Sequence, residues 1–116
     1  MKIARVAELL DARVLCCAEQ LEREVTSAFG ADLMSDVLAF MDAETLLLTG
    51  LVNAHVIRTA EVLELPCVVF VSGKMVEEDI LERAKAQNIV LLSTMLSLYE
   101  CCGMLYGAGL TGCKRG

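Results

Sequence analysis

Three short apolar runs decide the fold: Thr45-Leu46-Leu47-Leu48-Thr49-Gly50, Cys67-Val68-Val69-Phe70-Val71-Ser72-Gly73 and Ile89-Val90-Leu91-Leu92-Ser93-Thr94. Continuous runs of this length are typical of strands that are buried on both faces, as in parallel sheets. A helical pattern follows each run, so the chain repeats a strand–helix unit. We therefore predict an α/β fold, a mostly parallel five-stranded sheet with helices on both faces, in a single domain.

The segments outside these runs complete the plan. Apolar residues at helical spacing predict a first helix over residues 2–10, and two short strands are expected at residues 13–16 and 25–29. We expect the domain to occupy residues 1–110. The remaining residues, 111–116, are expected to form a flexible tail that nothing anchors.

Local signals mark the helices that lie between the strands. Asp32 and Asn53 are candidate N-caps, and Ser97-Leu98-Tyr99-Glu100 has the pattern of a capping box. Asp79 and Arg83 are four residues apart in the fourth helix, where we expect an ion pair. The helix after Asp32 is expected to bury an apolar stripe made of Met34, Val37, Leu38 and Met41.

The composition limits the class of partner. The chain has 116 residues, of which 56% are hydrophobic, and this excess favours a homodimer that covers apolar surface. The formal charge of −6 disfavours nucleic acid and anionic membranes, whose recognition needs a basic face. The one basic cluster is Lys114-Arg115. Neither a membrane span nor a signal peptide is recognisable, so we expect a cytoplasmic protein.

Small hydroxyl and glycine residues gather where the strands end. In a parallel sheet these ends share one edge, where ligands commonly bind. Amides, hydroxyls and one lysine at this edge favour an anion, such as a nucleotide or a phosphorylated metabolite. The alternative is that the same residues only form turns and helix caps. The candidate ligand-binding residues are Thr49, Gly50, Asn53, His55, Ser72, Gly73, Lys74, Ser93 and Thr94.

No catalytic signature accompanies these residues. A P-loop is ruled out because Met75 follows Gly73-Lys74 where a serine or threonine belongs. His55, the one histidine, has no nucleophile at a recognisable spacing. It is read as a solvated helix-start residue, with a role beside Asp32 or Asp36 as a distant alternative. We predict no catalytic residue, no metal and no cofactor.

Three other groups have a structural and a functional interpretation. Asp32 and Asp36 could share a cation on one helix face, or serve as a cap and a dipole-favouring acid. The methionines are expected to fill the core, with adaptable partner recognition as the alternative. Of the six cysteines, Cys16, Cys67 and Cys102 are expected to be small buried hydrophobes and Cys113 to be exposed. Their spacing does not fit a zinc site, and a redox role for Cys101, Cys102 or Cys113 stays open.

Several segments together resemble the DRTGG domain family. They are Glu22-Arg23-Glu24-Val25-Thr26-Ser27-Ala28, Asp32-Leu33-Met34-Ser35-Asp36-Val37, Val69-Phe70-Val71-Ser72-Gly73 and Leu91-Leu92-Ser93-Thr94. Ser27-Ala28 stands in place of the paired glycines of the family's namesake motif. The resemblance implies a small α/β domain similar to the N-terminal domain of HPr kinase/phosphorylase. It also implies a dimerising or regulatory element of the kind that accompanies CBS domains.

The sequence therefore leaves two functions open. The first is a non-enzymatic regulatory or scaffolding domain that acts as a homodimer, with a further protein partner left open. The second is a sensor that binds a nucleotide or a phosphorylated metabolite at the carboxyl ends of the strands.

Overall fold

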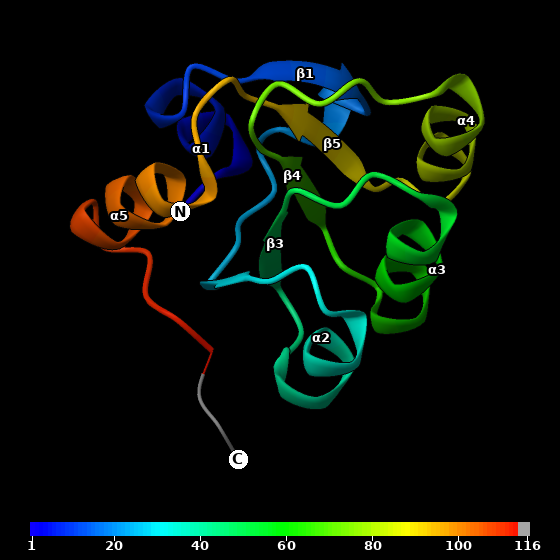
Figure 1. Cartoon of the computed structure of the whole chain (residues 1–116). Helices are drawn as coiled ribbons and strands as arrows, with labels where there is room; N and C mark the ends of the chain where they lie inside the picture. Colours follow the sequence, from blue (N-terminus) through cyan, green and yellow to red (C-terminus); the bar gives the residue numbers. More distant parts are fainter. Residues whose placement is uncertain (114–116) are drawn as a thin grey trace.

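A five-stranded sheet lies between two layers of helices in the computed structural model, which describes residues 1–113 (Figure 1). The strands are β1 (Arg13–Cys16), β2 (Ser27–Gly30), β3 (Thr45–Thr49), β4 (Cys67–Phe70) and β5 (Val90–Ser93). The helices are α1 (Ile3–Leu9), α2 (Met34–Phe40), α3 (Ala54–Leu63), α4 (Glu78–Ala86) and α5 (Leu98–Gly107), with a short 3-10 turn, η1 (Ala18–Gln20). The predicted α/β class and mostly parallel sheet are confirmed.

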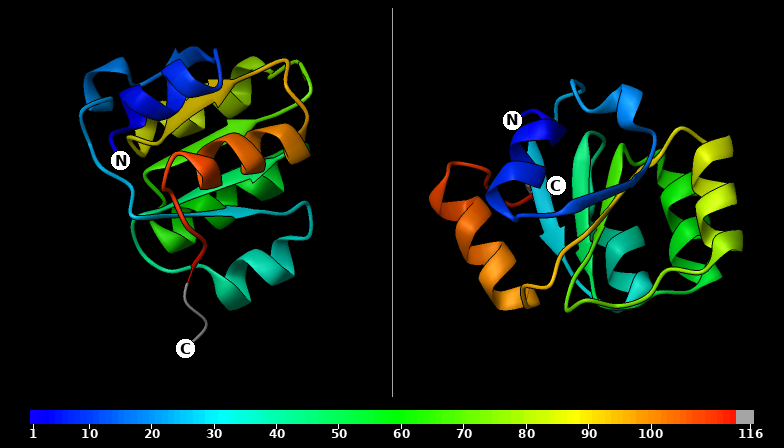
Figure 2. Two further views of the ribbon diagram at one scale, coloured as in Figure 1. Left: turned by 90° about the vertical axis from the view of Figure 1, so that its left-hand side faces the viewer. Right: turned by 90° about the horizontal axis from the view of Figure 1, so that it is seen from above.

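The strands lie in the order β1-β5-β4-β3-β2. Strands β2 to β5 are parallel neighbours, and β1 joins the far side of β5 in the antiparallel direction. Helices α2, α3 and α4 connect the successive parallel strands and lie together on one face, because consecutive crossovers of one hand return on the same side. Helices α1 and α5 cover the other face (Figure 2).

The central strands form the core because both of their faces are covered. Every residue of β3 and β4 is buried, which explains why their sequences are continuous apolar runs rather than alternating patterns. Phe70 is the largest of the fully buried side chains. The short helices of both layers add their apolar faces to this sheet.

The start of α2 differs from the expectation. Asp32 does not cap this helix, because the N-cap position is Leu33 and no side-chain bond is made there. The Asp32 side chain instead bonds to the end of β3. The buried stripe is also narrower than expected, since Leu38 is 48% exposed while Met34 and Val37 are buried.

The expected ion pair within α4 is absent from the described chain. Arg83 reaches across to α3 and donates three hydrogen bonds to the Glu61 carboxylate at 3.0–3.2 Å, rather than pairing with Asp79. A carboxylate on the neighbouring helix offers the flat guanidinium a two-oxygen acceptor, which favours it over the partner within the helix.

Both ends of the described chain form hydrogen bonds with β2 or with the segment just before it. Val25 and Met1 exchange two hydrogen bonds, so the strand begins at Ser27 rather than at residue 25. At the other end, the Ala28 amide donates to the Thr111 carbonyl at 3.0 Å, and Gly112 bridges to Ala28. The expectation that nothing anchors the tail is therefore wrong for residues 111–113. Lys114-Arg115 lies outside the described residues.

Candidate functional site

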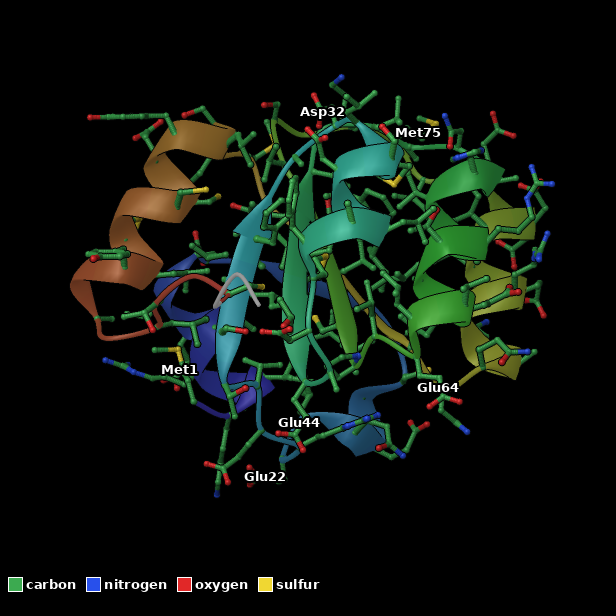
Figure 3. All side chains as sticks on the ribbon, turned by 90° about the horizontal axis from the view of Figure 1, so that it is seen from below. Met1, Glu22, Asp32, Glu44, Glu64 and Met75 are labelled. Carbon is green, nitrogen blue, oxygen red and sulfur yellow. The ribbon has the colours of Figure 1, made fainter. Side chains whose placement is uncertain are left out.

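The carboxyl ends of the parallel strands share one edge with the first residue of β1. Because β1 is antiparallel to β5, Arg13 pairs with Ser93 and lies at this edge. Asp32 and Met75 mark the same end of the sheet, whereas Met1 and Glu44 lie at the opposite end (Figure 3). The edge therefore combines the predicted strand-end residues with side chains from the start of the chain.

A carboxylate joins the ends of β2 and β3. Asp32 Oδ1 accepts hydrogen bonds from the Thr49 hydroxyl at 2.9 Å and from the Gly50 amide at 2.8 Å. The Thr49 oxygen in turn accepts from the Leu51 amide at 3.1 Å, and Lys74 Nζ donates to the Gly50 carbonyl at 3.2 Å. The Thr49 side chain and the Gly50 amide are thus engaged in holding the edge together.

A second network joins the ends of β4 and β5. The buried Thr94 hydroxyl donates to the Leu10 carbonyl at 2.7 Å and accepts from the Leu96 amide at 3.2 Å. The Ser72 and Gly73 amides donate to the Leu96 and Thr94 carbonyls at 2.8 and 2.9 Å. The Thr94 hydroxyl and the amides of Ser72 and Gly73 therefore hold together the turns that follow β4 and β5.

The turn after β4 requires an unusual backbone. Ser72 and Gly73 both have positive φ, 62° and 65°. A Cβ added at Gly73 would lie 2.7 Å from the Met95 sulfur, so the absence of a side chain lets Met95 lie directly over this turn. The exposed β4–α4 loop is thereby brought against the segment that follows β5.

A groove of about 570 Å³ opens beside this turn. Four of the predicted site residues line it: Gly73, Lys74, Ser93 and Thr94. Arg13, which was not among the predicted residues, also lines the groove. Only the pairing of β1 with β5 brings Arg13 there, and no local pattern in the sequence signals that pairing. The other lining residues are Asp11, Leu15, Met75, Val76, Leu81 and Met95.

The remaining predicted residues lie apart from the groove lining. Asn53 caps α3, accepting a hydrogen bond from the Val56 amide at 3.1 Å, as its position before the helix predicted. His55 is exposed in the first turn of α3, and its side chain makes no hydrogen bond to another residue within 1–113. Thr49, Gly50 and Ser72 surround the edge without lining the groove.

The acidic residues do not form a metal centre in the described chain. Asp32 precedes α2 and Asp36 lies within it, so the two do not share a helical face as expected. No group of three or more histidine, cysteine or acidic residues within 1–113 is placed to hold a metal ion.

The methionines divide between the core and the surface. Met34 and Met41 are buried, as expected. Met75 and Met95 are 88% and 83% exposed beside the groove, and Met104 on α5 is 42% exposed, so the core-filling interpretation is wrong for these three. Met75 and Met95 follow the ends of central strands, and a pattern of apolar residues alone does not distinguish such a loop position from a core position.

The buried thiols are poor nucleophiles. Burial raises the pKa of Cys17 and of Cys101 to about 11, and it raises the pKa of the fully buried Cys67 further. Cys16 is buried as expected, but Cys102 is only half-buried. Because the thiolate is the reactive form, groups with raised pKa values stay protonated and unreactive near neutral pH.

The last described residue, Cys113, is less exposed than expected. It is half-buried, and its sulfur lies 3.5 Å from the Thr45 hydroxyl and 3.7 Å from the Ser27 hydroxyl. These two hydroxyls are themselves 2.8 Å apart. Cys113 thus packs against the amino ends of β2 and β3, at the far side of the sheet from the groove.

A larger hollow, of about 770 Å³, lies at the amino ends of the strands. Arg5 and Arg23 line it together with Glu24 and Glu44, and Met1, which carries the N-terminal ammonium group, lines it as well. Within residues 1–113, none of the helices combines the length and apolar character needed to cross a bilayer.

The comparisons with known proteins identify the family. No curated protein matches the sequence. Among solved structures, the chain is similar to the CBS and DRTGG domains of the regulatory region of Clostridium perfringens pyrophosphatase, crystallised with its activator, diadenosine tetraphosphate. That match has a TM-score of 0.72 and 14% identity, and it covers 90% of this chain and 45% of the other. The present chain thus spans less than half the length of that protein, and the likeness is one of fold. The family model named DRTGG domain matches residues 5–108, and the chain belongs to the DRTGG domain family.

Proposed function

We propose that this domain is a regulatory module without a reaction of its own and that it acts as a homodimer through the outer face of α5. The similar fold in the regulatory region of a pyrophosphatase supports a regulatory role. The observation that supports the dimer is a stripe of exposed residues along one side of α5.

The stripe consists of Tyr99, Gly103 and Tyr106. These residues are at positions i, i+4 and i+7, so they lie on one side of the helix. Tyr99 is 88% exposed and Tyr106 is 68% exposed. Tyrosines are enriched in protein interfaces, where their rings bury a large area and their hydroxyl groups still find hydrogen-bond partners. The side of the molecule that carries α5 faces the viewer in the left panel of Figure 2.

The spacing of this stripe suits a second copy of the same helix. In a two-fold pair, residue i of one copy meets residue j of the other, and the reverse contact is made as well. Tyr99 and Tyr106 are placed almost evenly on either side of Gly103. Two antiparallel α5 helices that cross at Gly103 would therefore pair each Tyr99 with the partner's Tyr106.

Gly103 removes the steric barrier to this crossing. A Cβ added there would have no atom within 4 Å in the monomer, so the position is open to the outside. Gly107, one turn further along, is equally open. Small residues on a helix surface let two backbones approach closely, which increases the contact area of the flanking tyrosines.

The test is the molecular mass in solution. Gly103→Leu should leave the monomer folded, because the added side chain meets only open space and leucine is a better helix former than glycine by about 0.8 kcal/mol. It should nevertheless convert the dimer to a monomer in sedimentation velocity. Val62→Glu is the matched control, because Val62 is an exposed apolar residue on α3, in the other helix layer.

A monomeric wild-type protein at high micromolar concentration would refute the homodimer. A dimer that survives Gly103→Leu but is lost in Val62→Glu would place the interface on the α2–α4 layer instead.

A second candidate function is the sensing of a small ligand, and the groove beside β5 favours it. Four predicted residues meet there with a cationic side chain from β1. The pyrophosphatase region of similar fold was crystallised with a nucleotide activator, which supports a ligand-dependent role. A ligand that binds the folded state raises the melting temperature, so a panel of nucleotides and phosphorylated metabolites tests this function.

A further inference from the structure

We infer that the groove beside β5 binds a nucleoside monophosphate or a similar phosphate ester that carries an aromatic ring, with Arg13 as the main phosphate ligand and Met75 and Met95 against the ring. This inference rests on the second candidate function and names its anchor residue and ligand class. The charge, the apolar lining and the volume of the groove support this ligand class.

The groove carries positive charge in an acidic protein. Arg13 and Lys74 line it opposite a single acidic residue, Asp11, although the whole chain has a formal charge of −6. Arg13 is exposed and takes part in no ion pair or side-chain hydrogen bond within residues 1–113. Its guanidinium is therefore free to bind a phosphate with two parallel hydrogen bonds.

Lys74 adds a second positive charge to the lining. Its ammonium group donates to the Gly50 carbonyl at 3.2 Å, which leaves two of its three hydrogens for other acceptors. That bond also ties the β4–α4 loop to the end of β3. The position of Lys74 is thus fixed by the fold, while its charge has no carboxylate partner among the described residues.

The rest of the groove is apolar in a way that suits a ring. Met75 and Met95 are among the most exposed large apolar side chains of the protein, at 88% and 83%. Thioethers make favourable contacts with aromatic rings and adapt to their shape. Half-buried Leu15, Val76 and Leu81 add apolar surface to the lining. An inorganic phosphate would leave this surface uncovered.

The volume agrees with a ligand of this size. Small-molecule sites are commonly about 300–1,000 Å³, and the groove has about 570 Å³. The hollow at the amino ends is larger, but it opposes its cations with two carboxylates, those of Glu24 and Glu44. The exposed Met75 and Met95 side chains, rather than net charge, therefore distinguish the groove beside β5 as a site for a ring.

The experiment is a titration of the full chain with adenosine monophosphate, adenosine and inorganic phosphate, followed by calorimetry and by amide NMR shifts. We expect adenosine monophosphate to bind more tightly than either part and to shift the amides of residues 73–76 and 93–95. Arg13→Gln should weaken this binding about tenfold or more, because it removes a charge-assisted contact. Arg58→Gln is the matched control, since Arg58 is an exposed arginine on α3 and should leave binding unchanged.

A second pair of variants separates the ring from the phosphate. Met95→Ala should weaken adenosine monophosphate and leave inorganic phosphate unaffected, whereas Lys74→Gln should weaken both. Met95 is 83% exposed, so its removal does not threaten the fold.

The outcomes distinguish this inference from the proposed functions. Unchanged affinity in Arg13→Gln, or shifts at other residues, would overturn the inference while ligand sensing stands. Stabilisation by some other metabolite but not by nucleoside monophosphates would overturn the ligand class alone. If no compound binds, both the inference and the sensor are refuted, and the homodimer is judged separately by its mass.

Discussion

Asp32 links two neighbouring strands through one oxygen atom. Its Oδ1 accepts from the Thr49 hydroxyl and the Gly50 amide, so the segment after β2 is tied to the end of β3. Thr49 is fully buried, and its hydroxyl has no access to water as a substitute partner. The sequence predicted that Asp32 would make a local bond at the start of α2. In the structure its carboxylate instead bonds to Thr49, 17 residues away.

Removing this carboxylate should therefore destabilise the whole domain. We expect Asp32→Ala to lower the free energy of unfolding by about 1–3 kcal/mol, because a buried hydroxyl and an amide lose their acceptor. Urea denaturation measures the loss. Asp36→Ala is the control, since this exposed acid lies in the first turn of α2 and should cost less than about 0.5 kcal/mol. Equal losses in the two variants would mean that Asp32 acts only through the helix.

Between elements, helices α3 and α4 are joined by one ion pair on the surface. Arg83 donates to both Glu61 oxygens, which gives the pair a defined geometry across the two helices. Both side chains keep contact with solvent, with 44% and 23% exposure. The pair thus sets how the two helices align more than it holds them together.

The stabilisation from this pair should be small but measurable. We expect Arg83→Gln to lower the free energy of unfolding by less than about 1 kcal/mol and to lose this effect in high salt, where surface charges are screened. Asp79→Asn should cost only the small dipole contribution of an acid in the first turn of α4, and this cost should be less than that of Arg83→Gln, because Asp79 does not contact Arg83. Thermal unfolding at low and high salt measures both variants. A larger effect of Asp79→Asn would restore the local pair that the sequence suggested.

The sequence predicts elements better than it predicts contacts between them. The runs at β3, β4 and β5, the strand at residues 13–16 and the Asn53 and Ser97 caps all depend on neighbouring residues, and all are confirmed. The partners of Asp32 and Arg83 lie 17 to 22 residues away, so local spacing gave the wrong partner for each. Four site residues meet in the groove as their strand-end positions implied, but Arg13 depended on a strand pairing that no local pattern reveals.

At the scale of the whole molecule, thiols with raised pKa values are found both in the sheet and in the segments packed around it. Cys17 follows β1, Cys67 is in β4 and Cys101 is in α5, and burial raises the pKa of each thiol. The folded state therefore holds their protons more tightly than the unfolded chain, whose thiols titrate near 9.0.

This difference should make the domain sensitive to alkali. Below pH 9 the thiols are protonated in both states and their full contribution to stability is present. As pH rises from 9 to about 11, only the unfolded chain loses protons, so the stability falls. We expect the urea midpoint to drop over this window, and Cys67→Ala to show a shallower drop. Val69→Ala is the control, because it removes packing in the same strand without changing a titration. Equal slopes in all three proteins would refute the role of the thiols.

The four parallel strands are bordered on both sides by segments from distant parts of the chain. Strand β1 pairs with β5 on one side, and on the other the segment at Thr111 and Gly112 pairs with Ala28 of β2. A ribosome synthesising this chain would release β1 long before β5, and β2 long before the segment at Thr111 and Gly112. Loops of this length are slow to close. Co-translational folding would therefore leave unpaired strand borders until those two segments were made, and an unpaired border can pair with another chain.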